Sequence, residues 1–253
     1  MRIAIIIPAR HASSRLPGKP LLKATGKFLV QHVYERACAA QCAAEVIVAT
    51  DDSRIVEAVE SFHGRAMMTR DDHVSGTDRV AEVAERLSAD VIVNLQGDEP
   101  QIDPRAIDSL VQQLREAPAS EMATLAVPIR DRSLYDNPNV VKVVCDNRGR
   151  ALYFSRSPIP FCRDGEPDFK AEPAKYLQHL GLYAYRRKAL LQLAKTPPHP
   201  LEEMEKLEQL RMLGTGGAIQ VGVVLESHRG VDTPADYEEF VRTYRSSSSR
   251  RAA

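Results

Sequence analysis

The segment IAIIIPARHASSRLPGKPLL, residues 3–22, begins as a short apolar run and becomes a cationic loop with no polar transition between them. Residues 3–7 are isoleucine and alanine and are followed by Pro8, which predicts a central parallel strand. Arg10, Arg15 and Lys19 follow that strand. In open α/β sheets ligands bind at the carboxyl ends of the strands, and neighbouring cations repel one another unless an anion lies among them. The segment therefore predicts a phosphate-binding loop.

A strand followed by a helix recurs through the first half of the chain. We predict helices over residues 28–41, 54–62, 78–87 and 104–115, and further strands over residues 46–50, 66–69, 91–95 and 122–127. Apolar residues recur at helical spacing in the helical segments, whereas the strands are short apolar runs. This alternation is typical of an α/β protein whose parallel sheet is covered by helices.

The pattern changes from about residue 137, where strand-like runs lie closer together. We expect a mixed-sheet lobe built from the runs VVKVVCD, RALYFSR and HLGLYAYR. The polar, proline-rich residues 163–173 predict a mobile loop. We also predict a helix over residues 201–213, a strand over residues 219–224 and a last helix from Pro234 to about Tyr244.

Composition and charge exclude several classes of protein. The 253 residues contain 34 Lys and Arg and 34 Asp and Glu, so the chain lacks the broad basic field of most nucleic-acid-binding proteins. No apolar run approaches the roughly 20 residues that a membrane-spanning helix needs. The four cysteines form no CxxC pair, which predicts reduced thiols and no zinc site. We therefore expect a soluble, cytoplasmic protein with neither nucleic acid nor membrane as a partner.

A second motif, VNLQGDEP over residues 93–100, follows another predicted strand. It places Asp98 at the carboxyl edge of the sheet, and Gly97 would let a backbone approach a ligand closely. Mg²⁺ commonly binds one or two carboxylates together with phosphate oxygens. Acidic residues are also common in turns after strands, so Asp98 in isolation fits a turn as well as a metal site. Its position beside the cationic loop favours the metal site.

Two further motifs are ambiguous on their residues alone. GVDTPADYE, residues 230–238, precedes the last predicted helix, and Asp232 in that position is more often an N-cap than a ligand. HVSGTDR, residues 73–79, contains Ser-Gly-Thr-Asp, which is a common helix cap. Neither motif predicts a ligand site without further support.

The motifs together resemble one known family. PARHASSRLPGKPL, residues 8–21, closely resembles the signature loop of the CMP-KDO synthetases, the 3-deoxy-manno-octulosonate cytidylyltransferases, and VNLQGDEP and GVDTPADYE are similar to two other blocks of that family. The resemblance runs from residue 3 to about residue 244. It implies a Rossmann-like nucleotide-diphospho-sugar transferase fold, with a mixed, mostly parallel sheet and a smaller mixed-sheet lobe.

The resemblance also implies a domain organisation. A single nucleotidyltransferase domain would span residues 1–245, with residues 1–130 mainly binding CTP and residues 131–245 forming the lobe for sugar binding and for assembly into a homodimer. Residues 246–253 are low in complexity and are expected to form a disordered tail.

By the same resemblance, the first loop cradles the triphosphate of CTP. Lys19, Arg10 and Arg15 would be the catalytic cations, since positive charge there would balance the charge that grows on the transferring and leaving phosphates. The implied nucleotide-binding residues are Pro8, Ala9, Arg10, Lys19, Ser75, Gly76, Gln96 and Gly97. Asp98 and Asp232 are implied to bind the Mg²⁺ cofactor.

The second half of the chain is implied to bind the sugar acid. The residues concerned are Arg156, His179, Tyr183, Glu208 and Gln209. They supply a cation for a carboxylate and a mixture of donors and acceptors for hydroxyl groups. Each one taken alone fits an ordinary strand or helix-surface position.

The implied reaction converts CTP and KDO into CMP-KDO and pyrophosphate, which activates KDO for lipopolysaccharide synthesis. The anomeric hydroxyl of KDO would attack the α-phosphorus in line. Two alternatives remain open. One is a cytidylyltransferase for a related ulosonic acid, such as sialate or 8-amino-KDO. The other is a nucleotide sensor without catalysis, which the intact Lys19, Asp98 and Asp232 disfavour.

Overall fold

The computed structural model describes residues 1–12, 16–226 and 230–251, with side chains as far as residue 246. The chain divides into two compact units. The first unit contains residues 1–107 and 228–253, and the second contains residues 108–227. The segment that carries Asp232 therefore belongs to the same unit as the cationic loop.

The sheet of the first unit is parallel throughout. Its strands lie in the order β3-β2-β1-β4, with β1 (Ile3–Ala9) between β2 (Glu45–Thr50) and β4 (Val91–Asn94), and β3 (Ala66–Met68) beyond β2. Every residue of β1 is buried, as its apolar sequence predicts for a central strand. Because β1 and β4 are parallel neighbours, the loops that follow them leave the sheet at the same edge.

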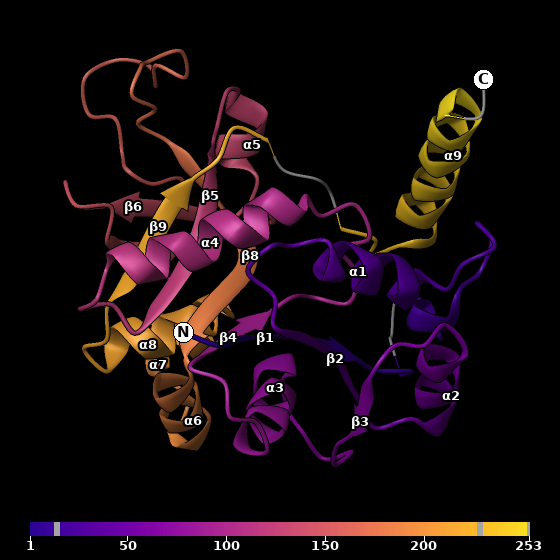
Figure 1. Cartoon of the computed structure of the whole chain (residues 1–253). Helices are drawn as coiled ribbons and strands as arrows, with labels where there is room; N and C mark the ends of the chain where they lie inside the picture. The colour runs from indigo at the N-terminus through magenta and orange to yellow at the C-terminus, as the bar shows by residue number, and fades with distance from the viewer. Residues whose placement is uncertain (13–15, 227–229, 252–253) are drawn as a thin grey trace. The chain divides into compact units, whose positions relative to one another are not determined.

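Helices cover this sheet. α1 (Leu29–Cys38) and α3 (Gly76–Glu85) both contact β1 and β2, and Figure 1 shows them on opposite sides of these strands. α2 (Ser53–Ser61) contacts β2 and β3. The last helix, α9 (Pro234–Arg251), packs Phe240 into a buried cluster with Leu16, Leu29 and Val231. The parallel, helix-covered sheet that the sequence predicts is confirmed.

The second unit contains a mixed sheet. β5 (Met122–Pro128) pairs in parallel with β9 (Ile219–Val223) and antiparallel with β8 (Leu177–Arg186). β6 (Lys142–Cys145) runs antiparallel to both β7 (Ala151–Ser155) and β8. The mixed-sheet lobe that the closely spaced runs predict is thereby confirmed. α4 (Pro104–Glu116) begins in the first unit and ends in the second.

Several elements differ from the sequence prediction. The helix expected over residues 201–213 is two helices, α7 (Pro200–Glu205) and α8 (Gln209–Gly214), because Lys206 has a φ of 54° and ends the first of them. Three short elements were not predicted from the sequence: the 3-10 helix η1 (Lys19–Leu21), α5 (Arg132–Asp136) and α6 (Arg187–Lys195).

The expected disordered tail also differs in part. α9 continues to Arg251, so residues 246–251 are helical, whereas residues 252 and 253 lie outside the described part of the chain. Residues 246–251 are all serine or arginine. Because this segment contains no glycine or proline, which break helices, nothing in its sequence ends the helix earlier.

Residues 163–173 contain no helix or strand, as expected of a loop. Phe169 packs against the rings of Tyr135 and Tyr176, and Arg130 and Arg132 form ion pairs with Glu172 and Glu166. The predicted mobility of this loop stays a prediction.

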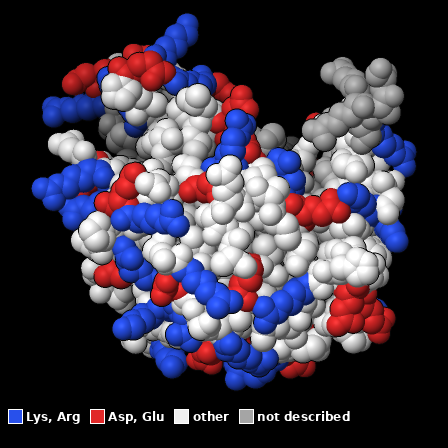
Figure 2. All heavy atoms as spheres, in the orientation of Figure 1, with Lys and Arg blue, Asp and Glu red and all other residues white. Residues whose placement is uncertain are grey.

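Charged side chains of both signs are mixed at the surface (Figure 2). On the face drawn in Figure 2, Lys and Arg side chains lie interspersed with Asp and Glu side chains. Within the described ranges, no helix combines the length and the apolar character that a transmembrane helix requires.

Candidate active site

Lys19 brings two carboxylates together in the first unit. It begins η1 after β1, and its Nζ lies 2.9 Å from Asp98 Oδ2 and 3.4 Å from Asp232 Oδ1. The Val231 carbonyl accepts a third hydrogen bond at 2.9 Å. The Lys19 side chain is 14% exposed, so its charge is partly shielded from water. The cation of the first motif and the carboxylates of the second and third thus meet at one point.

A tight turn presents Lys19 in this position. The N–H of Gly18 donates to the His11 carbonyl at 3.1 Å, and the N–H of Lys19 donates to the Leu16 carbonyl at 3.1 Å. Gly18 has a φ of 65°, which glycine adopts without the cost that a Cβ would add. Leu16 is anchored in the cluster with Leu29 and Phe240, so the turn rests on the core of the unit.

Asp232 is not the N-cap of α9. That role belongs to Thr233, whose hydroxyl accepts from the Asp236 N–H at 3.2 Å, while Asp236 Oδ2 accepts from the Thr233 N–H at 2.9 Å. The Val231 N–H donates to the Asp98 carbonyl at 2.8 Å, which joins the two acidic loops through their backbones. The reciprocal cap therefore removes the structural alternative for Asp232 that the sequence left open.

Glu99 is a third carboxylate at this place, and sequence reasoning missed it. Burial raises the pKa of Glu99 to about 7, with smaller contributions from the charges of Asp98 and Asp232. Its carboxylate lies close to Gly230, since a Cβ on that glycine would come within 3.2 Å of Glu99 Oε1. The only available signal was its place after Asp98 in QGDEP. Asp98 and Asp232 already exceed the charge of the one ammonium group, and this excess of negative charge helps to keep the proton on Glu99.

Four predicted nucleotide-binding residues lie beside one another. A Cβ on Gly97 would come within 2.8 Å of the Pro8 carbonyl, and a Cβ on Gly76 would lie 3.5 Å from Pro8 Cγ and 3.9 Å from Gln96 Oε1. Gln96 Nε2 donates to Asn94 Oδ1 at 3.1 Å. The sequence predicts that Gly97 lets a ligand approach the backbone closely. The structure gives a different reason, because the close neighbour is the backbone of β1.

Ser75 is the N-cap of α3, as its motif allows. Its hydroxyl accepts from the Asp78 N–H at 3.1 Å and lies 3.0 Å from Asp78 Oδ2, while Asp78 Oδ2 accepts from the Ser75 N–H. The Ser75 side chain is therefore occupied by the cap. The neighbouring Gly76 starts the helix, whose N-terminal dipole favours anions.

Arg10 and Ala9 continue from β1 into the loop. Arg10 Nη2 donates to the His73 carbonyl at 3.0 Å, which links the first loop to the segment before α3. The His73 ring in turn lies 2.5 Å from Glu82 on α3. Ala9 is the buried last residue of β1. Arg15, the remaining predicted cation, lies outside the described residues.

Arg79 is a second residue that sequence reasoning missed, although it ends the HVSGTDR motif. It is fully buried on α3, pairs with Asp51 at 2.7 Å and donates to Thr69 and to the Arg70 carbonyl. Its Nε has no hydrogen-bond partner among the described residues. The guanidinium fixes α3 against the ends of β2 and β3, and with it the position of Gly76.

In the second unit, an irregularity in β8 brings His179 and Tyr183 together. Tyr183 pairs with Thr124 of β5, but Leu180 pairs with the next residue, Leu125, so β8 carries two extra residues at this point. His179 and Tyr183 lie four apart in sequence, yet their partners on β5, Ala126 and Thr124, are only two apart. The two rings consequently lie 5.5 Å apart between centroids.

Gln209 extends this cluster from α8. The Tyr183 hydroxyl donates to Gln209 Oε1 at 3.3 Å, and Gln209 Nε2 is a buried donor with no partner among the described residues. Burial lowers the pKa of His179 to about 3, so its ring is neutral near neutral pH. Burial, with a smaller contribution from the charge of Glu208, raises the pKa of Tyr183. The cluster thus offers neutral groups and one orphaned donor, although buried donors are normally satisfied by a partner.

Arg156 lies directly after β7, next to the corner between α7 and α8. Its Nε donates to the Glu205 carbonyl at 2.8 Å and its Nη1 donates to the Pro138 carbonyl at 3.0 Å. It is the cation of the predicted sugar-binding set. All five predicted sugar-binding residues therefore lie in the second unit, and the predicted nucleotide- and metal-binding residues that are described lie in the first.

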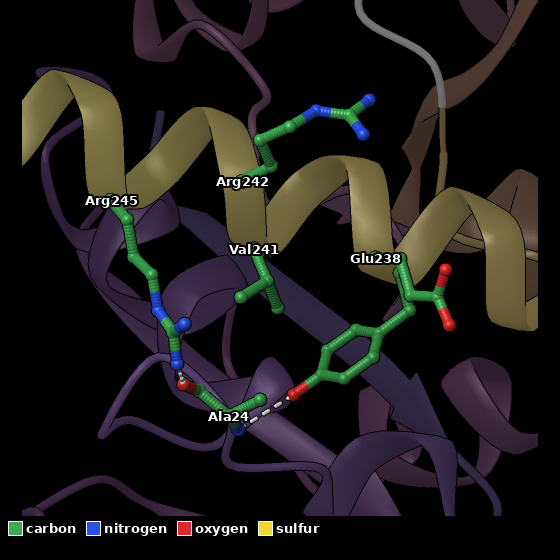
Figure 3. A pocket seen from close by; sticks show the side chains of 6 residues that line it. Ala24, Glu238, Val241, Arg242 and Arg245 are labelled. Carbon is green, nitrogen blue, oxygen red and sulfur yellow. Dashed lines mark hydrogen bonds between the residues drawn. The ribbon is translucent and has the colours of Figure 1, made fainter.

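A surface pocket elsewhere in the first unit does not contain these residues. Its lining consists of Ala24, Tyr237, Glu238, Val241, Arg242 and Arg245. Figure 3 shows the Arg245 guanidinium directed at Ala24, to whose carbonyl it donates at 2.8 Å. The Ala24 N–H donates to the Tyr237 hydroxyl at 2.8 Å. These polar groups attach α9 to the segment before α1, so the pocket has a structural explanation.

Comparisons with known proteins agree on one family. The sequence model described as "Cytidylyltransferase" matches residues 4–219. A 3-deoxy-manno-octulosonate cytidylyltransferase of Syntrophobacter fumaroxidans is 53% identical over 95% of this chain and 96% of its own length, and one of Escherichia coli is 50% identical over 94% of each. A solved structure of a CMP:2-keto-3-deoxy-manno-octonic acid synthetase complexed with CTP has a TM-score of 0.91 and 48% identity, and the match covers 98% of this chain and 100% of that one.

Proposed function

The chain belongs to the cytidylyltransferase family, and we propose that it transfers the CMP group of CTP to 3-deoxy-D-manno-octulosonate (KDO), giving CMP-KDO and pyrophosphate. Relatives that match nearly its whole length carry that activity in their names. The observation that carries the proposal is the meeting of Lys19, Asp98 and Asp232 at one point after β1. A sensor that only binds a nucleotide would need no such arrangement.

In the proposed reaction, the anomeric hydroxyl oxygen of KDO forms a bond to the α-phosphorus of CTP. The bond from that phosphorus to the bridging oxygen of pyrophosphate breaks, and pyrophosphate leaves with the electron pair. The hydroxyl proton passes to solvent. Negative charge grows on the transferring and leaving phosphates, and Lys19, Arg10 and Arg15 are the cations proposed to stabilise it.

We further propose that Asp98 and Asp232 hold Mg²⁺. The donor set fits this ion, since two carboxylates converge on a point where a cation, the Lys19 ammonium, already lies. When bound, Mg²⁺ would supply positive charge to the phosphates and lower the pKa of a coordinated hydroxyl. Among the described residues, no group of three or more His, Cys, Asp or Glu is arranged to hold a metal, which suits an ion that takes its other ligands from phosphate and water.

The sugar acid is proposed to bind in the second unit. Arg156 would pair with the KDO carboxylate, since arginine recognises carboxylates through charge-assisted hydrogen bonds. The orphaned Nε2 of Gln209 supports a hydroxyl acceptor at that place, because buried donors are normally satisfied. His179, Tyr183 and Glu208 complete the proposed set.

The test is pyrophosphate release from the purified chain with Mg²⁺, using CTP, UTP, ATP or GTP with KDO. Sialate and 8-amino-KDO replace KDO in parallel reactions. Release that requires CTP and KDO together is the expected result. Faster release with sialate or 8-amino-KDO would assign a different sugar, and tight CTP binding without release in any pairing would favour a sensor. Omission of Mg²⁺, with EDTA present, checks the proposed metal dependence.

We propose that the protein acts as a homodimer in the cytoplasm and supplies CMP-KDO for lipopolysaccharide synthesis. Exposed apolar side chains of the second unit support the assembly, among them Leu152 on β7, Phe161 and Leu225. Light scattering after size exclusion should give twice the 28.1 kDa of the chain. Substitution of Leu152 by aspartate should shift that mass towards one chain if β7 lies in the interface.

A further inference from the structure

Arg156 is held in place through its backbone as well as its side chain. Its N–H donates to Glu205 Oε2 at 3.0 Å, and its carbonyl accepts from Lys142 Nζ at 2.5 Å. Its Nε donates to the Glu205 carbonyl, and its Nη1 donates to the Pro138 carbonyl. Four hydrogen bonds therefore fix this one residue, and Glu205 accepts two of them.

The Glu205 carboxylate binds two consecutive residues after β7. Its Oε2 accepts from Arg156, and its Oε1 accepts from the Ser155 hydroxyl at 2.6 Å. The oxygen of that hydroxyl accepts from the Ser157 N–H at 3.0 Å. Hydrogen bonds to a carboxylate are stronger than those between neutral groups. The end of β7 is therefore fixed by a charge-assisted network centred on Glu205.

Lys142 holds the other side of the same peptide. It is fully buried, and its ammonium group donates to the carbonyls of Asn137, Val140 and Arg156. All three of its donors are used within the chain. Lys142 thus stabilises this loop, because its ammonium group binds three backbone carbonyls and has no further donor for a ligand.

This arrangement leaves part of the Arg156 guanidinium for a ligand. Its Nε and Nη1 are engaged by carbonyl groups, whereas Nη2 has no hydrogen-bond partner among the described residues. A guanidinium whose orientation is set by neutral carbonyls keeps its full charge for an anion. The Arg156 side chain is already ordered by these hydrogen bonds, so it would lose little rotamer freedom when its free donors bind an anion.

Glu205 also lies at a second key position. It is the last residue of α7, and the left-handed Lys206 follows it and turns the chain towards Glu208 and Gln209. The same residue therefore connects the cation of the sugar-binding set with the corner that carries two of its other members. The Arg156 guanidinium contacts the backbone carbonyl of Glu205 and not its carboxylate, so the two side chains form no ion pair.

We propose that Glu205 is a positioning residue for recognition of the sugar carboxylate, acting through Arg156. This inference rests on the proposed function. Glu205 need not touch the substrate, because its carboxylate fixes the backbone from which the Arg156 side chain projects. Loss of the carboxylate would let the guanidinium move without removing its charge, and recognition of the sugar acid would weaken while recognition of CTP would not.

The test is a double-mutant cycle on the full chain with Glu205→Gln, Arg156→Ala and the double variant. Glu203→Gln is the matched control, since Glu203 lies exposed on the same helix. We expect Glu205→Gln to raise the KM for KDO about tenfold, the size of one hydrogen bond to a charged group, and to change the KM for CTP less than twofold. In the Arg156→Ala background, Glu205→Gln should change the KM for KDO no further.

Equal increases in both KM values, or effects that multiply in the double variant, would overturn the inference, since a general structural role predicts them. If circular dichroism shows that Glu205→Gln does not fold, the test is repeated with Glu205→Asp. Aspartate keeps the negative charge, but its side chain is one methylene shorter. A wild-type chain that does not couple KDO to CTP would reject the proposed function itself. Normal wild-type turnover with an unresponsive Glu205 variant would reject only the positioning role.

Discussion

Lys19 places one positive charge between two carboxylates that the proposed metal needs. Its ammonium lies 2.9 Å from Asp98 and 3.4 Å from Asp232, so it balances one of the two negative charges when no other cation is present. A divalent ion would have to compete with this ammonium for the same oxygens. In the proposed reaction the lysine then serves the phosphates that arrive with the nucleotide.

The variant Lys19→Met separates these two roles. Turnover should fall by about 10²- to 10³-fold, the usual effect of removing one donor that stabilises transition-state charge. This variant should bind Mn²⁺ more tightly in the absence of nucleotide, because the competing ammonium is gone. Electron paramagnetic resonance of the free ion measures this binding. Asp98→Asn is the control and should bind Mn²⁺ more weakly. Weaker Mn²⁺ binding by Lys19→Met would contradict the competition.

Thr124 controls the geometry of His179 at the residue scale. It is fully buried on β5, and its hydroxyl lies 3.0 Å from His179 Nε2 and within 3.0 Å of the carbonyls of Leu180 and Leu182. A hydroxyl has one proton, so it donates to one of these three groups at a time, and it accepts from Nε2 when that ring nitrogen carries the proton. The hydroxyl thereby holds the irregular part of β8 in shape.

We expect Thr124→Val to raise the KM for KDO and to cost about 1–3 kcal/mol of unfolding free energy, because it leaves buried polar groups without partners. Thr124→Ser keeps the hydroxyl and should keep a KM for KDO close to that of the wild type. Kinetics with KDO varied at saturating CTP, together with urea unfolding, measure both effects. Identical KM values for the two variants would show that the hydroxyl does not position His179.

At the scale of elements, His32 joins α1 to α9. It is buried, its Nε2 lies 2.7 Å from the Thr25 hydroxyl, and its ring makes edge contacts with Phe240 and Tyr244. Burial lowers the pKa of His32 to about 4. The folded chain therefore keeps this imidazole neutral at pH values where the unfolded chain protonates it.

The consequence is a dependence of stability on pH with a definite sign. Since the unfolded state binds the proton more tightly, the contribution of His32 is complete above about pH 6.5 and is lost as the pH falls towards 4. At pH 5 the loss should be about 2 kcal/mol. The glutamine of His32→Gln can still form a hydrogen bond with Thr25 but cannot be protonated. Between pH 7.5 and 5.0, the free energy of unfolding measured with urea should therefore fall by about 2 kcal/mol less in this variant than in the wild type. Equal losses in the two proteins would exclude His32 as the cause.

At the scale of the whole molecule, the chain leaves the first unit after residue 107 and returns to it at residue 228. The returning segment supplies Asp232 to the site and Phe240 to the core. Phe240 is 4% exposed and packs with Leu16 and Leu29 beneath the first loop. The C-terminal segment is therefore part of both the fold and the site of the N-terminal half.

Phe240→Ala should lower the free energy of unfolding by about 3–5 kcal/mol, because it removes a large buried ring and leaves a cavity. The exposed neighbour Glu239 provides the control, and Glu239→Ala should change stability by no more than about 0.5 kcal/mol. Urea unfolding followed by circular dichroism measures both. A loss below about 1 kcal/mol for Phe240→Ala would mean that α9 adds little to the core.

The sequence by itself determined the elements whose residues carry local signals. Five consecutive apolar residues predict β1, apolar spacing predicts α1 and α3, and the parallel sheet follows from their alternation. The motif resemblance determined the family, and near-complete matches to curated relatives confirm it. The motif resemblance also predicted a set of site residues, namely Lys19, Asp98 and Asp232. Without the resemblance, the position of Asp232 before the last helix favours an N-cap.

The tertiary structure decided what depends on pairing between distant segments. Thr233, and not Asp232, caps α9, and only the folded chain shows Asp232 beside Lys19. The approach of His179 to Tyr183 depends on two extra residues in β8, and these are defined only by the register against β5. Glu99, Arg79 and Glu205 act through neighbours remote in sequence. Local patterns report a residue's own conformational preference, whereas these roles depend on contacts that exist only after the chain has folded.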